Sequence, residues 1–208
     1  MTTTTANEIE TVIFDLGAVL IDWNPEYLYR KIFDREADMQ EFLQDVCTPE
    51  WNAQQDAGRS WAEAVQILSD RHPNYSPEIR AYWDRWPEML NGPIEGSVRI
   101  LKKIAVQQKY RLLALTNWSA ETWPYAWEQY DFLQLFEGIL VSGAEALKKP
   151  DERIYRLLIE RYDFDPGKAL FIDDSPANVL AAQKVGIHAL HFTSPAALEA
   201  DLEVMGIL

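Results

Sequence analysis

Residues 11–20 read TVIFDLGAVL, and this stretch decides the fold. The apolar and β-branched residues 11–14 lead directly to Asp15, and Gly17 follows two positions later. A short apolar run that stops at a turn is typical of a buried β-strand. The sequence therefore predicts a buried strand with a carboxylate at its carboxyl end.

The same pattern recurs along the chain. Strand-like apolar runs lie at residues 111–115, 138–141, 169–172 and 187–192. Helical patterns lie between and after them, at residues 95–108, 121–130, 151–162 and 176–185, with a last helix beginning near Ser194. Because strands alternate with helices, we expect an α/β fold with a doubly wound, Rossmann-like parallel sheet that helices cover on both faces.

Residues 22–92 interrupt this alternation. Their helical patterns are separated by prolines, no convincing strand lies between them, and they hold five of the eight tryptophans. Most of these tryptophans are expected to pack a small helical bundle. We therefore predict an all-helical cap domain over residues 22–92, inserted into a core of residues 1–21 and 93–208.

The composition excludes several classes of partner. The 33 acidic and 19 basic residues give a formal net charge of -14, which opposes binding to nucleic acid or to an anionic membrane surface. The apolar runs are shorter than the roughly 20 residues of a membrane span. Residues 1–10 lack the pattern of an export signal, and the single cysteine, Cys47, fits a reducing compartment, so we expect a cytoplasmic protein. The oligomeric state is not predicted.

Polar residues follow the predicted strands, and the carboxyl edge of such a sheet is where ligands bind. The chain offers four groups there: Asp15 with Gly17, Thr116 with Asn117, Lys148 with Lys149, and Asp173 and Asp174 with Asn178. A carboxylate at a strand end can attack phosphorus and form an aspartyl-phosphate, which divides one hard hydrolysis into two easier steps. Neighbouring carboxylates repel one another unless a cation lies among them, and Mg²⁺ prefers oxygen ligands.

In order, spacing and placement these groups resemble the four motifs of the haloacid dehalogenase-like (HAD) superfamily, over nearly the whole chain outside the insertion. The resemblance implies a phosphatase with Asp15 as nucleophile. Its Mg²⁺ would be held by Asp15, Asp174 and the backbone carbonyl of Gly17, with Asp173 assisting directly or through water. Phosphate would be bound by Thr116, Asn117 and Lys149. The positive charge of Lys149 would also stabilise the transition state.

Two assignments stay open in these motifs. Lys149 is preferred over Lys148 because the family's lysine stands directly before a proline, but Lys148 is adjacent. Asn117 and Asn178 are expected to brace the loops by hydrogen bonding, and a purely structural role fits either equally well.

Gly17 departs from the family's phosphatase pattern. Related phosphatases carry an aspartate there that protonates the departing oxygen, an effect worth about a hundredfold to ten-thousandfold. Without it, turnover is expected to favour better leaving groups. This makes a sugar 1-phosphate the leading small-molecule substrate, and it fits a branch of the family that resembles this chain in having glycine there. Asp22 is a candidate substitute acid.

Two alternatives remain. A 2-haloacid dehalogenase would use Asp15 to displace halide through an ester intermediate and would need no metal, but Asp173 and Asp174 favour phosphoryl chemistry. A catalytically weak ligand-binding homologue would explain the missing acid, yet Asp15, Thr116 and Lys149 are retained.

The insertion is expected to select the substrate, with Trp23, Asn24, Tyr27, Trp51 and Trp86 as candidates.

Overall fold

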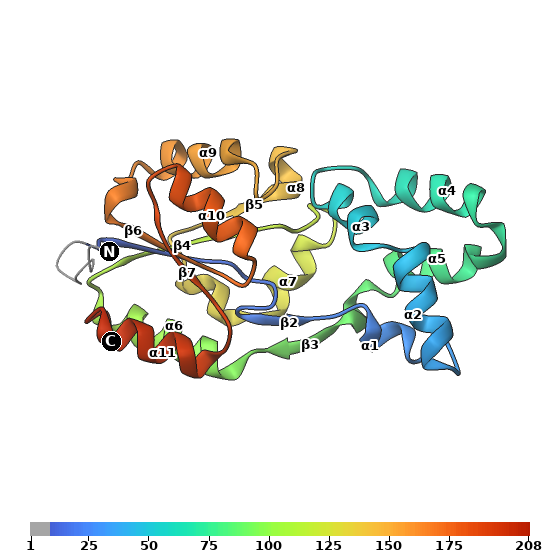
Figure 1. The fold of residues 1–208 in the computed structure, drawn as a ribbon, viewed down its shortest axis with the longest axis horizontal. Helices are drawn as coiled ribbons and strands as arrows, with labels where there is room; N and C mark the ends of the chain where they lie inside the picture. Colours follow the sequence, from blue (N-terminus) through green and yellow to red (C-terminus); the bar gives the residue numbers. More distant parts are fainter. Residues whose placement is uncertain (1–8) are drawn as a thin grey trace.

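The computed structural model describes residues 9–208. The first eight residues, with the threonine run and the start of the predicted core segment, lie outside the described part. Figure 1 shows a sheet flanked by helices on one side of the molecule and a purely helical portion on the other, joined by two extended segments.

The central sheet has five parallel strands in the order β5-β4-β1-β6-β7. Their bounds are Thr11–Phe14 for β1, Arg111–Thr116 for β4, Gly138–Val141 for β5, Ala169–Asp173 for β6 and His188–His191 for β7. The predicted parallel sheet is confirmed. β1 lies between β4 and β6, with Phe14 beside Ala114 and Ile172. Strand order reverses at β1, so the crevice for a ligand opens at its carboxyl end.

Helices cover both faces of the sheet (Figure 1). These are α6 (Glu95–Gln107) and α11 (Pro195–Val204) on one face, and α9 (Glu152–Tyr162) and α10 (Pro176–Lys184) on the other. Successive side chains of β1 point to opposite faces of the sheet. Val12 and Phe14 pack in the cluster that includes Leu101 of α6, whereas Ile13 packs with Leu158 of α9. The side chain of Ser194 caps α11, as predicted.

Shorter elements complete the core. They are α7 (Trp123–Gln129), η3 (Asp131–Leu135), α8 (Ser142–Glu145) and η4 (Pro166–Lys168). Across residues 9–208, no helix combines the length and apolar character needed to cross a membrane.

Between the two extended segments the chain is helical. The elements are α1 (Glu26–Tyr29), α2 (Glu36–Asp45), α3 (Pro49–Gln55), α4 (Trp61–Arg71), η1 (Pro73–Tyr75), α5 (Ser76–Asp84) and η2 (Trp86–Met89). Aromatic rings fill their interior: Trp61 stacks on Tyr82 with centroids 5.5 Å apart, and Trp51 meets Tyr82 edge-on at 5.1 Å. The predicted helical insertion is therefore present, and its division from the core at residues 22 and 92 remains a proposal.

Two features of the insertion were not predicted. The extended segments, β2 (Ile21–Trp23) and β3 (Leu90–Pro93), form an antiparallel ribbon with Asp22 opposite Gly92. Strands this short leave no alternation to detect. Helix α3 was missed because Pro49 was interpreted as a separator, although it occupies the first helical turn behind Thr48, whose hydroxyl accepts from the Trp51 N–H at 3.1 Å.

The loop between α3 and α4, together with the first residue of α4, docks the insertion onto the core. Trp61 donates from Nε1 to Ser119 Oγ at 3.0 Å and from its backbone N–H to Glu121 Oε1 at 2.8 Å. Ser142, at the end of β5, donates its hydroxyl to the carbonyl of Asp56. The loop therefore rests on the segments that follow β4 and β5.

Candidate active site

Asp15 lies at the carboxyl end of β1. Its backbone N–H donates to the Ile172 carbonyl at 2.9 Å, and its Oδ1 accepts from the Leu16 N–H at 2.7 Å. The side chain is nearly buried. Burial raises the pKa of Asp15 to about 7 in the metal-free protein; Lys149 opposes this rise, and the neighbouring carboxylates Asp173 and Asp174 add to it.

Lys149 bridges two of the carboxylates. Its Nζ lies 2.8 Å from Asp15 Oδ1 and 2.6 Å from Asp173 Oδ2, and it donates to the Leu115 carbonyl at 3.0 Å. Burial lowers the pKa of this amine, but Asp15 and Asp173 raise it by more, so the net shift is upward. Lys149 is therefore a fixed positive charge inside the site.

Asp173 and Asp174 have different surroundings. The buried Asp173 also accepts from the Ser175 N–H at 2.8 Å and from Asn178 Nδ2 at 2.9 and 3.1 Å. Asp174 is exposed as a residue, but partial desolvation of its carboxyl, together with the charge of Asp173, raises its pKa. Asp173 is thus held by protein donors, while the Asp174 carboxylate faces solvent.

Asp15, Asp173 and Asp174 form a cluster suited to a cation. One carboxylate oxygen from each residue lies within 4.8 Å of the others. The set contains only oxygen donors, which hard divalent cations such as Mg²⁺ prefer. The raised pKa values of Asp15 and Asp174 show that the site favours added positive charge, either as protons or as a metal ion.

The second motif contributes one free hydroxyl and one brace. Thr116 Oγ1, at the end of β4, is buried and has no hydrogen-bond partner within residues 9–208. The Asn117 side chain accepts from the Lys149 N–H at 2.8 Å and donates to the Lys149 carbonyl at 3.0 Å. Asn117 therefore positions the backbone of Lys149, while Thr116 retains a donor for a ligand.

A cavity of about 70 Å³ opens beside this cluster. It lies where the core meets the insertion, and its lining consists of Gly17, Trp23, Asn52, Asp56, Trp86, Asn117, Trp118, Ser119 and Thr122. Gly17 and Asn117 connect it to Asp15 and Lys149. Aromatic rings and a few polar groups around one space are typical of a small-molecule site.

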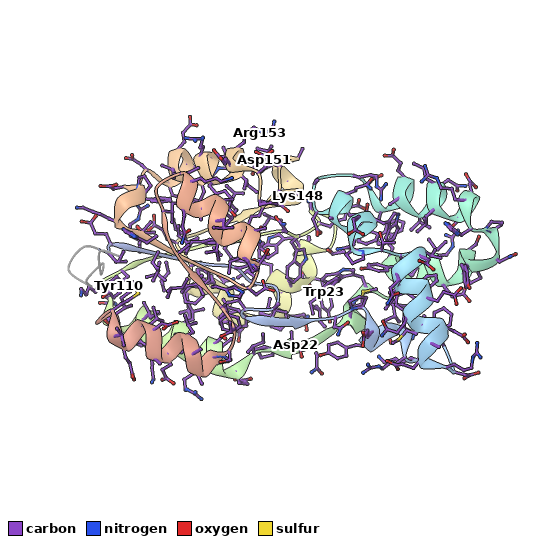
Figure 2. The ribbon with its side chains drawn as sticks, in the orientation of Figure 1. Asp22, Trp23, Tyr110, Lys148, Asp151 and Arg153 are labelled. Carbon is purple, nitrogen blue, oxygen red and sulfur yellow. The ribbon has the colours of Figure 1, made fainter. Side chains whose placement is uncertain are left out.

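Two of the expected selector residues, Trp23 and Trp86, line the cavity, and three have other contacts. Asn24 accepts from the Glu26 N–H at the start of α1, Tyr27 donates to Asp22, and Trp51 packs within the insertion. Figure 2 shows Trp23 at the junction between the two parts of the molecule.

The structure does not support Asp22 as the substitute acid. Its carboxylate accepts from the Tyr27 hydroxyl at 2.9 and 3.0 Å and from Asn91 Nδ2 at 2.9 Å. Asp22 lies on the β2–β3 ribbon (Figure 2). It is not among the residues that line the cavity. Asp22 is close to the first motif in the sequence, but its carboxylate is held by Tyr27 and Asn91 outside the cavity lining.

Asp56 is the acidic residue of the cavity lining, and the sequence did not reveal it. It follows α3, outside the four motifs, and is one of 33 acidic residues in the chain. Its side chain accepts from Asn52 Nδ2 at 3.3 Å. No local pattern distinguishes it, because only the docking of the insertion brings it to the cavity.

Comparison with known proteins agrees with this architecture. A family model described as haloacid dehalogenase-like hydrolase matches residues 9–186. The sesquiterpene phosphatase astK of Aspergillus oryzae is 26% identical over 184 residues, which cover 88% of this chain and 90% of astK. A phosphorylated carbohydrates phosphatase of Thermotoga maritima is 23% identical, covering 88% and 84% of the two chains.

Solved structures share the fold. A magnesium complex of a HAD family enzyme from Bacteroides thetaiotaomicron superimposes with a TM-score of 0.70 at 22% identity, covering 90% of this chain and 94% of that one. The L-2-haloacid dehalogenase of Xanthobacter autotrophicus superimposes with a TM-score of 0.64 at 17% identity, covering 96% of this chain and 84% of that one. With the family match over most of its length, this chain belongs to the haloacid dehalogenase-like hydrolases and is an enzyme of that family.

Proposed function

We propose that this enzyme is a magnesium-dependent phosphatase that hydrolyses a small phosphate monoester through an aspartyl-phosphate on Asp15. The observation that carries the proposal is the buried contact of Asp15 with Lys149, beside two further carboxylates that can share a cation. A phosphate group brings negative charge into this site, so a cation and a lysine there serve phosphoryl transfer.

The oxygen donors fit Mg²⁺. Asp15, Asp174 and the Gly17 carbonyl would hold the ion, and Asp173 would assist from its fixed position between Lys149 and Asn178. When bound, the ion neutralises charge on the phosphoryl group.

The protein groups account for the remaining chemistry. An Asp15 carboxylate oxygen attacks phosphorus, and the bond from phosphorus to the alcohol oxygen breaks. Lys149 supplies a fixed positive charge, and the unpartnered hydroxyl of Thr116 donates to a phosphoryl oxygen. Water then attacks the phosphoryl group and frees Asp15.

The dehalogenase alternative has weaker support. Displacement of halide from carbon adds no charge that a cation must neutralise, so the cluster of Asp15, Asp173 and Asp174 would have no task. The similarity to the Xanthobacter dehalogenase concerns the fold, which hosts more than one chemistry. The two named relatives are both phosphatases, and their alcohols differ, which favours the phosphate ester over any particular alcohol.

For the substrate we propose a sugar phosphate. Trp23, Trp86 and Trp118 give the cavity an apolar, aromatic wall for a sugar ring, and Asn52 and Asp56 offer partners for its hydroxyls. Sugar 1-phosphates stay the leading prediction on the basis of Gly17, provided that no other residue supplies the missing proton.

The direct test is phosphate release from p-nitrophenyl phosphate and a panel of sugar 1- and 6-phosphates, with Mg²⁺ or with EDTA. We expect release with Mg²⁺ and its loss in EDTA. Metal-independent halide release from 2-chloropropionate, without phosphate release, would instead establish the dehalogenase. If neither reaction occurs and aluminium fluoride with Mg²⁺ shows no binding by fluorine NMR, the result favours the ligand-binding homologue over the phosphatase.

Stabilisation by Mg²⁺ should depend on pH. In the metal-free protein the pKa of Asp15 is raised from 3.8 to about 7, chiefly by burial. Between these values the folded state holds a proton that the unfolded chain releases, so stability falls as pH rises through this window. Mg²⁺ competes with that proton. The gain in Tm from Mg²⁺ over EDTA should be larger at about pH 8 than at about pH 5.5, and the reverse order would contradict the assignment.

A further inference from the structure

Asp56 faces the active site from the insertion. It follows α3 and lines the cavity together with Gly17, which is two residues from Asp15, and with Asn117, which braces Lys149. The charge of Lys149, whose ammonium contacts Asp15, also acts on the Asp56 carboxyl. An ester whose phosphorus lies at Asp15 would therefore extend its alcohol toward Asp56.

The position of Asp56 is fixed from both parts of the molecule. Asn52 Nδ2 donates to its carboxylate from the same helix at 3.3 Å, and the Ser142 hydroxyl of the core donates to its carbonyl. A few residues further on, Trp61 donates to Ser119 and Glu121. These contacts hold Asp56 relative to Asp15, although the two residues lie in different parts of the fold.

The surroundings of Asp56 suit a proton donor. Burial raises its pKa to about 7, against the opposing effects of Lys148, Lys149 and the backbone of Ser119. Tyr82, from α5, also faces it, and Asp56 contributes to the raised pKa of that phenol. A large fraction of Asp56 is therefore protonated near neutral pH, as a general acid requires.

The cavity wall at Gly17 has space but no acid. A Cβ built on Gly17 would meet no other atom within 4 Å. A side chain at position 17 would thus enter open space. The core leaves the donor's place empty, and a carboxyl group reaches the same cavity from the insertion.

We propose that Asp56 is the proton donor to the departing oxygen of the substrate and takes over the task that Gly17 cannot perform. This inference rests on the proposed phosphatase function. As the Asp15 oxygen bonds to phosphorus, the bond to the alcohol oxygen breaks, and that oxygen keeps the electron pair and takes the proton of Asp56. In the second step the Asp56 carboxylate accepts a proton from the attacking water, the phosphorus–Asp15 bond breaks, and both residues return to their initial states.

Such a donor changes the expected substrate range. Protonation of the departing oxygen makes esters of ordinary alcohols accessible, including sugar 6-phosphates. The preference for 1-phosphates that Gly17 predicts should then appear only when Asp56 is disabled. The leaving-group dependence of Asp56→Asn therefore tests the inference directly.

The experiment compares wild type, Asp56→Asn and the control Glu50→Gln, an exposed carboxylate on α3, the helix that Asp56 follows. With Mg²⁺ present, kcat/KM for glucose 6-phosphate should fall about a hundredfold to ten-thousandfold in Asp56→Asn. For p-nitrophenyl phosphate, whose leaving group needs no proton, it should change by less than about tenfold. The control should behave as wild type. In wild type, kcat/KM for glucose 6-phosphate divided by kcat/KM for p-nitrophenyl phosphate should fall as pH rises through about 7. In Asp56→Asn this ratio should not change with pH.

A second variant separates a chemical role from a structural one. Gly17→Asp in the Asp56→Asn background places a carboxyl in the open space at position 17 and should restore at least part of the glucose 6-phosphate activity. An equal loss on both substrates without rescue, or no loss on glucose 6-phosphate, overturns the role of Asp56. Absence of Mg²⁺-dependent p-nitrophenyl phosphate hydrolysis in wild type overturns the phosphatase proposal itself, so the two failures are distinguishable.

Discussion

Asp15→Asn is expected to lose more than about a thousandfold of kcat for p-nitrophenyl phosphate with Mg²⁺, because the amide cannot form the covalent intermediate. The variant should still fold. Its asparagine removes one of three clustered carboxylates, and the raised pKa of Asp15 shows that its charged form is disfavoured there. Lys149 keeps its contact with Asp173 at 2.6 Å.

The measurement pairs steady-state rates with acid quenching and hydroxylamine trapping of the aspartyl-phosphate, which wild type should accumulate and the variant should lack. Asp201→Asn, an exposed carboxylate on α11, serves as the matched control and should keep wild-type rates. Activity of Asp15→Asn within about tenfold of wild type would show that another group attacks phosphorus.

Lys149→Met is expected to cost about 3 to 5 kcal/mol of unfolding free energy near neutral pH, as well as activity. The substitution fills similar space but leaves Asp15 and Asp173 buried beside each other without their shared ammonium. Losing that positive charge raises the pKa of the Asp15 carboxyl further, because Lys149 opposes the rise in the intact protein. The folded variant then binds protons that the unfolded chain releases, so its stability falls as pH rises.

Urea unfolding in EDTA at about pH 6 and pH 8 measures this effect, with the larger deficit expected at the higher pH. Added Mg²⁺ should recover part of it, since the ion replaces some of the missing charge. Lys148→Met is the matched control, because Lys148 is the adjacent lysine and is only partly buried. This variant should lose less than about 1 kcal/mol of unfolding free energy. Equal deficits for the two variants would contradict the distinction between them.

The strand ends of the core could be predicted from the sequence for a physical reason. A buried strand needs an unbroken apolar run, so Asp15, Thr116 and Asp173 stand out as polar residues at the points where such runs stop. A parallel sheet then brings these ends to one edge, however far apart they lie in the chain. Residues 100 positions apart could thus be assigned to one site.

The insertion could be predicted only in outline. Helical periodicity identified the helices of the insertion except α3. Trp51 and Trp86 look alike in sequence, and only tertiary packing places one in the interior and the other at the cavity. Asp56 carries no local signal, since its role depends on the contacts of Trp61 and Ser142 with the opposite part of the chain. The direction of the Asn117 side chain, toward Lys149, likewise depends on a loop 32 residues away.

The docking of the α3–α4 loop on the core also has an evolutionary consequence. The contacts of Trp61 with Ser119 and Glu121 set both the shape of the cavity and the position of Asp56. A lineage that remodels this loop to accept a new alcohol therefore alters proton supply in the same event. An acid at position 17 would not depend on this loop, whereas an acid at position 56 makes substrate choice and proton transfer depend on the same contacts.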